Sequence, residues 1–500
     1  MSVYKKFAGQ TLVYGLSTIF SRLFVFILTP IYTRVYAQGV YGIFTIMYSY
    51  ASIINAILAF GMETTFFRYL NKHEDKKQEV YNNSFLVIGF LAVLFLMTGL
   101  VFADDFARFT LSSKNIADLA DQRKFVQYFI WILFVDAICV IPFAKLRADG
   151  RPFKYSLIKF LNIGIFVGLN LIFIFVIPFI IKYNGTSAEC FVTWFRPKWI
   201  GYVFVANLAA NVSTLLLLLP QFKALQLKFN KQLFYQMLAY SWPVLVANLS
   251  FIVNENLDKI LLSKYLPPLI AGKETGIYGA VCKLAIFISI FNTAFRLGAE
   301  PFFFSHAKKE NAKTTYATIL NYFVLALTVL FVGLIANIDL LKHFISPQYW
   351  VGLPAVPFLM FGYVCLGIYM NLSVWYRLSD QTRYGLYISL IGAVFTIVMN
   401  VMFIPKYGYM ASALVSMCAY FIIMVISYVL GQKHYPIPYH LKKIVAYLCT
   451  SVVLVILSFY TFKQNIYIGN ALLFVFLVAI YFIEKRNLTK LLTSTSSNED

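Results

Sequence analysis

The sequence predicts an all-α protein that crosses a membrane many times. Hydrophobic residues make up 60% of the 500-residue chain and charged residues only 13%, whereas soluble domains are about 45–50% apolar and about 25% charged. No soluble core could bury this excess. The apolar residues gather in runs of about 20, the length of helix that spans a bilayer. The alternating pattern that a membrane β-barrel requires is absent from the sequence.

Fourteen such runs predict about fourteen transmembrane helices. The first run lacks a small-residue cleavage site, so it is interpreted as a retained span rather than a signal peptide. The Ser- and Thr-rich segment 486–500 is predicted to be a disordered cytoplasmic tail. The predicted spans are residues 10–33, 40–62, 83–102, 125–146, 155–180, 199–219, 244–266, 277–298, 316–336, 354–376, 384–404, 409–430, 442–460 and 466–483.

The charge balance indicates how the chain is oriented in the membrane. The chain has 42 Lys and Arg against 21 Asp and Glu, a net charge of +21. In a soluble protein this excess would suggest nucleic acid, but here the cations lie in short loops between apolar runs. Cations that end a span are counted with the adjoining loop. The N-terminus, every second loop and the C-terminus then carry 26 cations, and the other loops carry 13. Because cytoplasmic loops are the more basic, both termini are predicted to be cytoplasmic, and no nucleic-acid partner is expected.

The sequence offers no chemistry typical of an enzyme. The longest loops have about 20 residues, so no large domain lies outside the membrane. No phosphate-binding loop, nucleophile elbow or zinc-protease motif is present in the sequence. The six cysteines and five histidines are scattered, which predicts no metal site and no disulfide framework. We therefore expect a protein that is not an enzyme and that holds no cofactor, although a coupling proton or sodium ion would fit.

An internal repeat supports transport instead. A shift of 237 residues superposes Arg22 on Lys259 and Glu63 on Glu300. So many matches at one shift, without a gap over about 50 residues, indicate a duplication. A shift of 230 residues pairs two further sites. The other pairs at 237 are Pro30 with Pro267, Tyr41 with Tyr278, Gly42 with Gly279, Asn55 with Asn292, Gly61 with Gly298, Phe66 with Phe303, Phe67 with Phe304 and Lys72 with Lys309; those at 230 are Arg147 with Arg377 and Asn170 with Asn400.

The repeat predicts two lobes. Residues 1–220 form an N-lobe of spans 1–6, and residues 221–432 form a C-lobe of spans 7–12. Residues 433–485 add spans 13–14 outside the repeat. Six spans per copy give parallel repeats, so the substrate path is expected between the lobes, with alternating access as they rock.

Three cations lie inside predicted spans, where a charge costs about 2.5–3.5 kcal/mol on insertion scales. These are Arg22, Lys259 and Lys283. One hypothesis is an anion site in the cleft, where Arg22 grips a phosphate with two hydrogen bonds and the lysines act as point charges. The alternative is structural pairing, for example of Lys259 with Asp258 or Glu255.

Carboxylates inside or near the spans have two interpretations each. Asp136, Glu255 and Asp258 could carry a coupling proton or sodium ion, since desolvation raises the pKa of a carboxyl group, or they could be counter-ions. Glu63 and Glu300 recur near the inner ends of spans 2 and 8. They could form a gate, or they could make helix-end contacts with nearby cations.

The two copies carry diffuse motifs that resemble a known family. Residues 21–44, SRLFVFILTPIYTRVYAQGVYGIF, and 59–72, AFGMETTFFRYLNK, recur as 255–266, ENLDKILLSKYL, and 276–303, GIYGAVCKLAIFISIFNTAFRLGAEPFF. These segments resemble bacterial polysaccharide transporters, the O-antigen and capsule oligosaccharide flippases of the multidrug/oligosaccharidyl-lipid/polysaccharide superfamily, whose fold is that of the MATE transporters. The likeness covers about residues 1–430.

The resemblance implies a flippase that moves polyprenyl-diphosphate-linked oligosaccharide from the inner to the outer leaflet of the bacterial inner membrane, in lipopolysaccharide or capsule synthesis. It assigns Arg22, Lys259 and Lys283 to a cationic central cavity, and Asp258–Lys259 to an acidic–basic pair in span 7. Implied partners are the lipid-linked oligosaccharide, membrane lipids, a polysaccharide polymerase and a chain-length regulator. A lipid II flippase, a multidrug or small-solute antiporter of the same superfamily, and a membrane polymerase or ligase remain as alternatives.

Overall fold

The computed structural model describes residues 26–111, 116–183, 189–226, 228–307, 310–379 and 381–496. Within these ranges every regular element is a helix, and twelve helical segments are long and apolar enough to span a membrane. The predicted first span, 10–33, lies mostly outside the described residues, which enter it as helix at residue 26. The chain is thus a multi-span helical protein, and the count of fourteen stays a prediction.

The helices follow one another with short connections, and segments predicted as loops contain short helices, α5 and α14 among them. In chain order the elements are α2 (Gln38–Ala59), α3 (Met62–Lys72), η1 (Glu74–Lys76), α4 (Lys77–Val101), α5 (Ala103–Thr110), α6 (Ile116–Ala148), α7 (Pro152–Leu171), η2 (Ile172–Val176), α8 (Ile177–Tyr183), α9 (Glu189–Val192), α10 (Gly201–Phe222), α11 (Lys231–Tyr265), α12 (Pro268–His306), α13 (Ala312–Ala336), α14 (Ile338–Leu341), η4 (Lys342–Phe344), η5 (Pro347–Ala355), α15 (Val356–Leu372), α16 (Val374–Leu378), α17 (Arg383–His434), α18 (Leu441–Ile456), η6 (Leu457–Thr461) and α19 (Ile466–Ser496).

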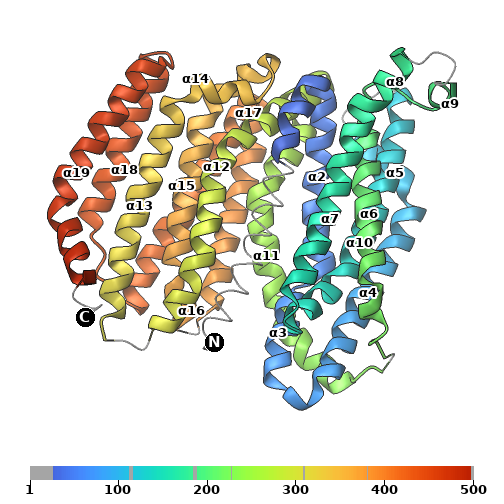
Figure 1. Ribbon diagram of the computed structural model, residues 1–500, viewed down its shortest axis with the longest axis horizontal. Coiled ribbons are helices and arrows are strands. Elements are labelled where there is room, and N and C mark those ends of the chain that lie inside the picture. The colour runs from blue at the N-terminus through green and yellow to red at the C-terminus, as the bar shows by residue number, and fades with distance from the viewer. Residues whose placement is uncertain are drawn as a thin grey trace.

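The long helices pack in two groups that run side by side (Figure 1). Helices α4, α6, α7 and α10 contact one another, and α11, α12, α15 and α17 form the second group, which α13, α18 and α19 flank. Helix α2 packs against α6 in the first group and against α11 and α12 in the second. We call the two ends of the bundle the α3 end, at the bottom of Figure 1, and the α14 end, at the top.

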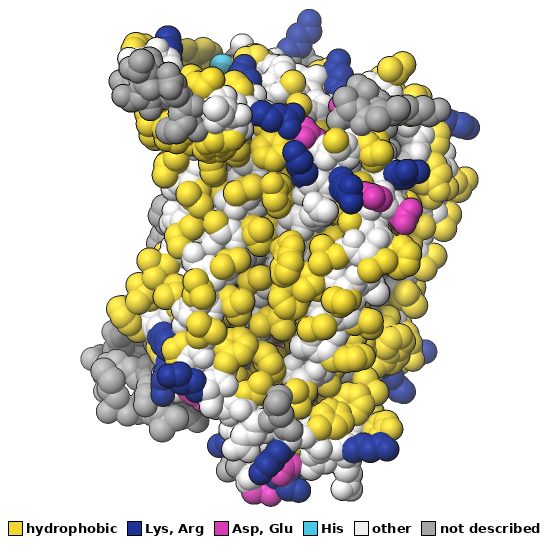
Figure 2. Space-filling view, turned by 90° about the vertical axis from the view of Figure 1, so that its right-hand side faces the viewer, with side chains coloured by type: hydrophobic (Ala, Val, Ile, Leu, Met, Phe, Trp, Pro, Cys, Tyr) yellow, Lys and Arg dark blue, Asp and Glu magenta, His cyan; other side chains and the backbone are white. Residues whose placement is uncertain are grey.

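Apolar side chains cover the middle of the bundle. Figure 2 shows hydrophobic residues across the centre of one face, with most Lys and Arg near its two ends. Large apolar side chains such as Phe90, Leu216 and Phe474 are exposed on the surface of the bundle. In water such a surface would be unfavourable, whereas lipid tails are as apolar as these side chains. The exposed band therefore marks the part of the molecule that faces lipid.

The 52-residue element α17 consists of two helices joined by a kink at Gly408, and they correspond to the predicted spans 384–404 and 409–430. Gly408 has φ 57° and ψ −141°, a conformation outside the helical region. A Cβ at this position would lie 2.8 Å from the Glu274 carboxylate on α12. Only a residue without a side chain fits both the backbone angles and the approach of α12, so glycine sets the bend.

We expect Gly408→Ala to lower the stability of the protein by about 1–3 kcal/mol, because alanine is strained at this φ and crowds Glu274. Thermal unfolding in detergent measures the loss. Gly164→Ala in α7 is the matched control, since nothing lies within 4 Å of a Cβ there. An equal shift for both variants would contradict this explanation of the bend.

The last helix is longer than the sequence predicts. Residues 486–496 continue α19 instead of starting the predicted disordered tail. Leu488, Leu491 and Leu492 keep the helical spacing of apolar residues, and no Pro or Gly stops the helix. Farther back, Glu484 on α19 is fully buried and accepts hydrogen bonds from side chains of α18.

Candidate functional site

The in-span residues Asp258 and Lys259 on α11 form an ion pair with each other. Lys259 Nζ lies 2.9 Å from Asp258 Oδ1 and donates to the Glu255 carbonyl at 2.6 Å. The other carboxylate oxygen of Asp258 accepts a hydrogen bond from the Tyr278 hydroxyl on α12 at 2.6 Å, with Ser416 Oγ at 3.4 Å. Asp258 is buried and Lys259 nearly so. The pair therefore neutralises itself inside the bundle, as the pairing hypothesis for Lys259 requires.

The space beside this pair is small. The cavity that Glu255, Tyr363 and Tyr420 line together with the pair has a volume of about 20 Å³. That is room for about one water molecule. In this conformation the polar cluster holds no space for a lipid-linked substrate.

Lys283 on α12 is an in-span cation without an ion-pair partner in the described residues. The structure gives its ammonium group no hydrogen bond or ion pair with any residue in the described ranges. One helical turn farther, Phe287 packs against Phe26, with ring centroids 5.1 Å apart. Phe26 follows Arg22 by four residues, but Arg22 itself lies outside the described residues. Among the described in-span cations, Lys283 therefore has no ion-pair partner, a feature that it shares with Lys159 on α7.

A larger polar cavity lies within the first group of helices. Its volume is about 360 Å³, and α2, α3, α6, α7 and α10 contribute to its lining. Asp136 on α6 accepts a hydrogen bond from Asn211 Nδ2 at 2.8 Å, and Lys159 on α7 shares the cavity. Arg147 and Glu63 form an ion pair of 2.5 Å in its wall. Four ionisable groups in a membrane-embedded cavity indicate a functional role more than a packing role.

Sequence reasoning missed one of these groups, Lys159. It lies near the start of the run 155–180, so it was assigned to the preceding loop, whereas its side chain enters the bundle and lies over the ring of Phe143. The signal was present, since Lys159 falls inside the apolar run, five residues after the last cation of the loop, Lys154.

The repeat relates the polar cavity to a second, smaller one. Arg377 lines a cavity with Asn292 among α12, α13, α15 and α16, and the repeat pairs these residues with Arg147 and Asn55 in the larger cavity. Both groups of helices thus place an arginine and an asparagine together. The backbone of Glu300 lies in α12, but its side chain is outside the described part of the chain.

At the α14 end, glycines bring α2 and α12 into backbone contact. A Cβ on Gly42 would lie 2.1 Å from the Gly272 carbonyl oxygen, and a Cβ on Gly276 would lie 1.9 Å from the Gln38 carbonyl oxygen. Real side chains never approach this closely, so α2 and α12 can meet here only through glycine. We call this contact the glycine seal.

Hydrogen bonds between the two halves of the chain continue the seal. Gln348 Nε2 in η5 donates to the carbonyls of Thr33 at 3.0 Å and Tyr36 at 3.2 Å. The Tyr349 hydroxyl also donates to the Tyr36 carbonyl, at 3.1 Å, and Gln38 donates to the Gln348 carbonyl. The chain before and at the start of α2 is therefore tied to the second group of helices. The bundle is closed at the α14 end.

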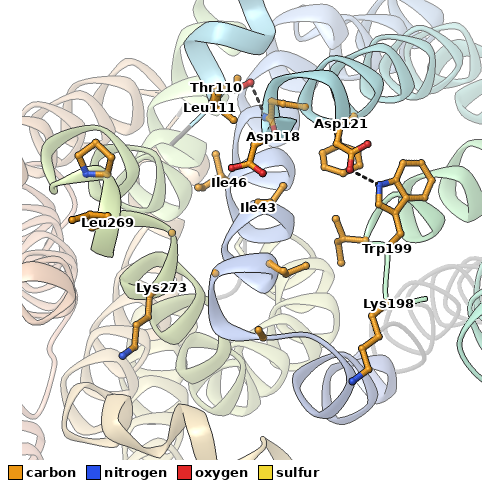
Figure 3. Close-up of a pocket in the computed structure, with 18 residues that line it drawn as sticks. Ile43, Ile46, Thr110, Leu111, Asp118, Asp121, Lys198, Trp199, Leu269 and Lys273 are labelled. Atoms are coloured by element: carbon orange, nitrogen blue, oxygen red, sulfur yellow. Dashed lines mark hydrogen bonds between the residues drawn. The ribbon is translucent and has the colours of Figure 1, made fainter. Parts of the chain in front are cut away.

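A cavity of about 480 Å³ lies beside this seal (Figure 3). Its wall comes from α2, α5, α6, the segment before α10, and the start of α12. Asp121 accepts two hydrogen bonds from Arg196, both 2.7 Å, and one from Trp199 at 3.1 Å. The hydrogen bonds that Arg196 donates to Asp121 raise the pKa of Arg196, so this pair stays ionised.

Comparisons with known proteins give one partial family match and several matches in fold. Residues 7–146 match the family model described as "Polysaccharide biosynthesis protein". The fold is similar to the solved structure "Lipid II flippase MurJ, inward closed conformation", with a TM-score of 0.66 and 14% identity over 96% of this chain and 100% of that chain. It is also similar to an inward-facing multidrug resistance MATE transporter of the MOP superfamily, with a TM-score of 0.61 and 13% identity over 86% and 96%. A third likeness is to a MOP superfamily transporter from Pyrococcus furiosus, with a TM-score of 0.55 and 13% identity over 88% and 96%.

No curated protein matches the chain in sequence. At 13–14% identity the solved structures show a shared fold, which is the MATE-like fold that the sequence resemblance implies. The solved proteins with this fold include multidrug transporters and a lipid II flippase. The family match covers residues 7–146 and the fold likeness covers most of the chain, so the chain resembles polysaccharide biosynthesis proteins in its first part and has a MATE- and MurJ-like fold.

Proposed function

We propose that the protein is a flippase that moves polyprenyl-diphosphate-linked oligosaccharide from the cytoplasmic to the periplasmic leaflet of the bacterial inner membrane. The observation that carries the proposal is the unpaired ammonium group of Lys283 inside a membrane-spanning helix. An unpaired charge at this depth is costly unless a ligand or water meets it. The diphosphate of the lipid carrier supplies the opposite charge, and Arg22 is the second cation that we assign to it.

We place the α3 end in the cytoplasm, because the loops richest in Lys and Arg, such as 72–77 and 145–154, lie there. The glycine seal then closes the periplasmic side. In this conformation the substrate enters from the cytoplasmic leaflet. Rocking of the N-lobe, residues 1–220, against the C-lobe, residues 221–432, opens the seal and releases the head group outside.

Gene deletion in the host tests the function. Loss of a flippase leaves polyprenyl-diphosphate-linked oligosaccharide on the cytoplasmic leaflet and removes the surface polysaccharide. Rescue with Lys283→Met should restore little of the surface polysaccharide, whereas wild-type rescue restores it fully. Unchanged lipid-linked pools with intact surface polysaccharide would exclude the function.

The second candidate function is that of a lipid II flippase, because the fold is similar to that of MurJ. Rescue of peptidoglycan synthesis in a strain without its lipid II flippase tests this candidate.

We expect the membrane potential to drive transport. A diphosphate carries about two negative charges, and moving each outward through 100 mV, inside negative, releases about 2.3 kcal/mol. Collapse of the potential in vesicles with a potassium ionophore should therefore slow initial flipping. Dissipation of a pH gradient at constant potential measures any proton coupling separately from this electrical contribution. Initial rates that stay the same without a potential would rule out this driving force.

Among the three in-span carboxylates, we assign ion coupling to Asp136. Asp258 is fully engaged by Lys259 and Tyr278, whereas Asp136 borders a cavity of about 360 Å³ that Lys159 shares. Asp136→Asn should make the flipping rate insensitive to a pH gradient while its dependence on potential remains. Asn162→Asp, which adds a carboxylate to the same cavity while keeping Asp136, is the control. A wild-type response to the pH gradient in Asp136→Asn would refute the assignment.

A further inference from the structure

The cavity beside the glycine seal is built by both halves of the chain (Figure 3). Helices α2 and α6 form one wall, and Leu269, Gly272 and Lys273 at the start of α12 form the opposite side. Gly272 also takes part in the seal, through its contact with Gly42. Because one residue belongs to both features, this cavity keeps its shape only while the seal is closed.

Charged groups in this cavity lack partners. Asp118, Lys198 and Lys273 form no hydrogen bond or ion pair with any residue of the described ranges, while Asp121 is already saturated by Arg196 and Trp199. In Figure 3 the ammonium ends of Lys198 and Lys273 lie away from the two carboxylates. Lys198 has φ 59°, a strained backbone conformation for a residue with a side chain. Strain of this kind persists where the surrounding structure fixes a side chain for a task.

The rest of the cavity lining combines apolar and polar side chains, a combination that suits a sugar ligand. Ile43, Ile46 and Leu111 give an apolar surface, and Gln122 and Thr110, which hydrogen-bond to each other at 2.8 Å, add polar atoms from α6 and α5. A volume of about 480 Å³ lies within the range of about 300–1,000 Å³ that is typical of small-ligand sites. A ligand with an anionic group for the lysines, hydroxyl donors for Asp118 and an apolar ring face would meet every part of the wall.

We propose that this cavity binds an acidic oligosaccharide on the periplasmic side and that binding stabilises the closed seal. The proposal rests on the proposed function, which delivers glycan to this side of the membrane. Glycan that accumulates outside then favours the conformation that is open to the cytoplasm. A ligand stabilises the state that it binds. The delivered glycan therefore favours the return of the transporter to the cytoplasm-open conformation and, as it accumulates, lowers the rate of further opening to the outside.

Calorimetric titration of the full chain in nanodiscs tests the proposal without a transport assay. The probes are trigalacturonate, an acidic trisaccharide; maltotriose, a neutral one; and glycerophosphoethanolamine, a lipid head group. We expect trigalacturonate to bind, maltotriose to bind at least fivefold more weakly, and the double variant Lys198→Gln/Lys273→Gln to lose at least fivefold in affinity for trigalacturonate. Lys182→Gln/Lys463→Gln removes the same charge from exposed positions outside the cavity and should bind as the wild type does.

A further variant tests the dependence on the seal. Gly276→Ala leaves the charged groups of the cavity in place but holds α12 away from α2, so it should also weaken trigalacturonate binding. Equal binding by both double variants, or tighter binding of glycerophosphoethanolamine than of trigalacturonate, would overturn the glycan assignment. Unchanged binding by Gly276→Ala would overturn the link to the seal. The leaflet assay for lipid-linked oligosaccharide reports on flipping separately, so a failure of the proposed function would be distinguished from a failure of this site.

Discussion

Gly276→Ala is expected to lower the initial rate of flipping on the order of tenfold to a hundredfold. The added methyl group would lie 1.9 Å from the Gln38 carbonyl oxygen on α2. Backbone atoms cannot rotate away as the end of a side chain can, so α2 and α12 must separate. Overpacking of this kind costs about 1–3 kcal/mol, and each 1.4 kcal/mol changes a population about tenfold. The closed state, and with it uptake from the cytoplasmic leaflet, should become rare.

A neighbouring glycine provides the control for this variant. A Cβ on Gly272 would lie 3.7 Å from the nearest atom, at ordinary contact distance, so Gly272→Ala should flip at close to the wild-type rate. The position of the seal can be read from Tyr349→Cys in a chain whose native cysteines are replaced by serine, since Tyr349 is buried against Tyr36. A membrane-impermeant maleimide added from outside should label Tyr349→Cys in the Gly276→Ala background and spare it in the Gly272→Ala background. Equal labelling of both would mean that the glycine contact is no gate.

Lys259→Met is expected to destabilise the folded protein by about 3–5 kcal/mol, because it leaves the Asp258 carboxylate buried without its cation. Asp258→Asn should cost a similar amount by leaving Lys259 unpaired. The double variant Asp258→Asn/Lys259→Met removes both charges and should regain most of the stability. Thermal unfolding in detergent measures all three.

Flipping by the double variant then separates the two hypotheses for Lys259. If Lys259 serves only as the partner of Asp258, the stable double variant keeps most of its activity. If Lys259 also contacts the substrate, the double variant folds but does not flip the substrate.

Lys283→Met is the contrasting case. Lys283 has no ion-pair partner in the described structure, so its removal should leave stability within about 0.5 kcal/mol while flipping falls. A strong loss of stability in Lys283→Met would show that its ammonium group is structural.

Most of the membrane architecture follows from local sequence. Hydropathy gives the spans because each crossing needs its own run of apolar residues. The kink at Gly408 lies where the sequence places the boundary between the predicted spans 384–404 and 409–430. The segment that the sequence predicts to be a disordered tail starts at residue 486, and the backbone of residues 486–496 is helical in α19.

The in-span charges were visible in the sequence, but their partners were not. The sequence offered Glu255 and Asp258 equally as counter-ions of Lys259. The structure selects the Asp258 carboxylate, with the Glu255 backbone carbonyl as the second acceptor. Asp136 and Lys159 come from different helices, and no spacing along the chain could have indicated that they border one cavity.

The sequence by itself determined that this protein is a multi-span helical bundle with an internal repeat, because apolar runs and repeated residues are properties of the chain read one segment at a time. Only the tertiary structure decided which in-span charge is neutralised and which is free, and which glycines form a seal. Those outcomes depend on the distances between helices far apart in sequence, and such distances are set by packing around the whole bundle. The cavity beside the seal is likewise decided only by the tertiary structure, since neither half of the chain encloses it alone.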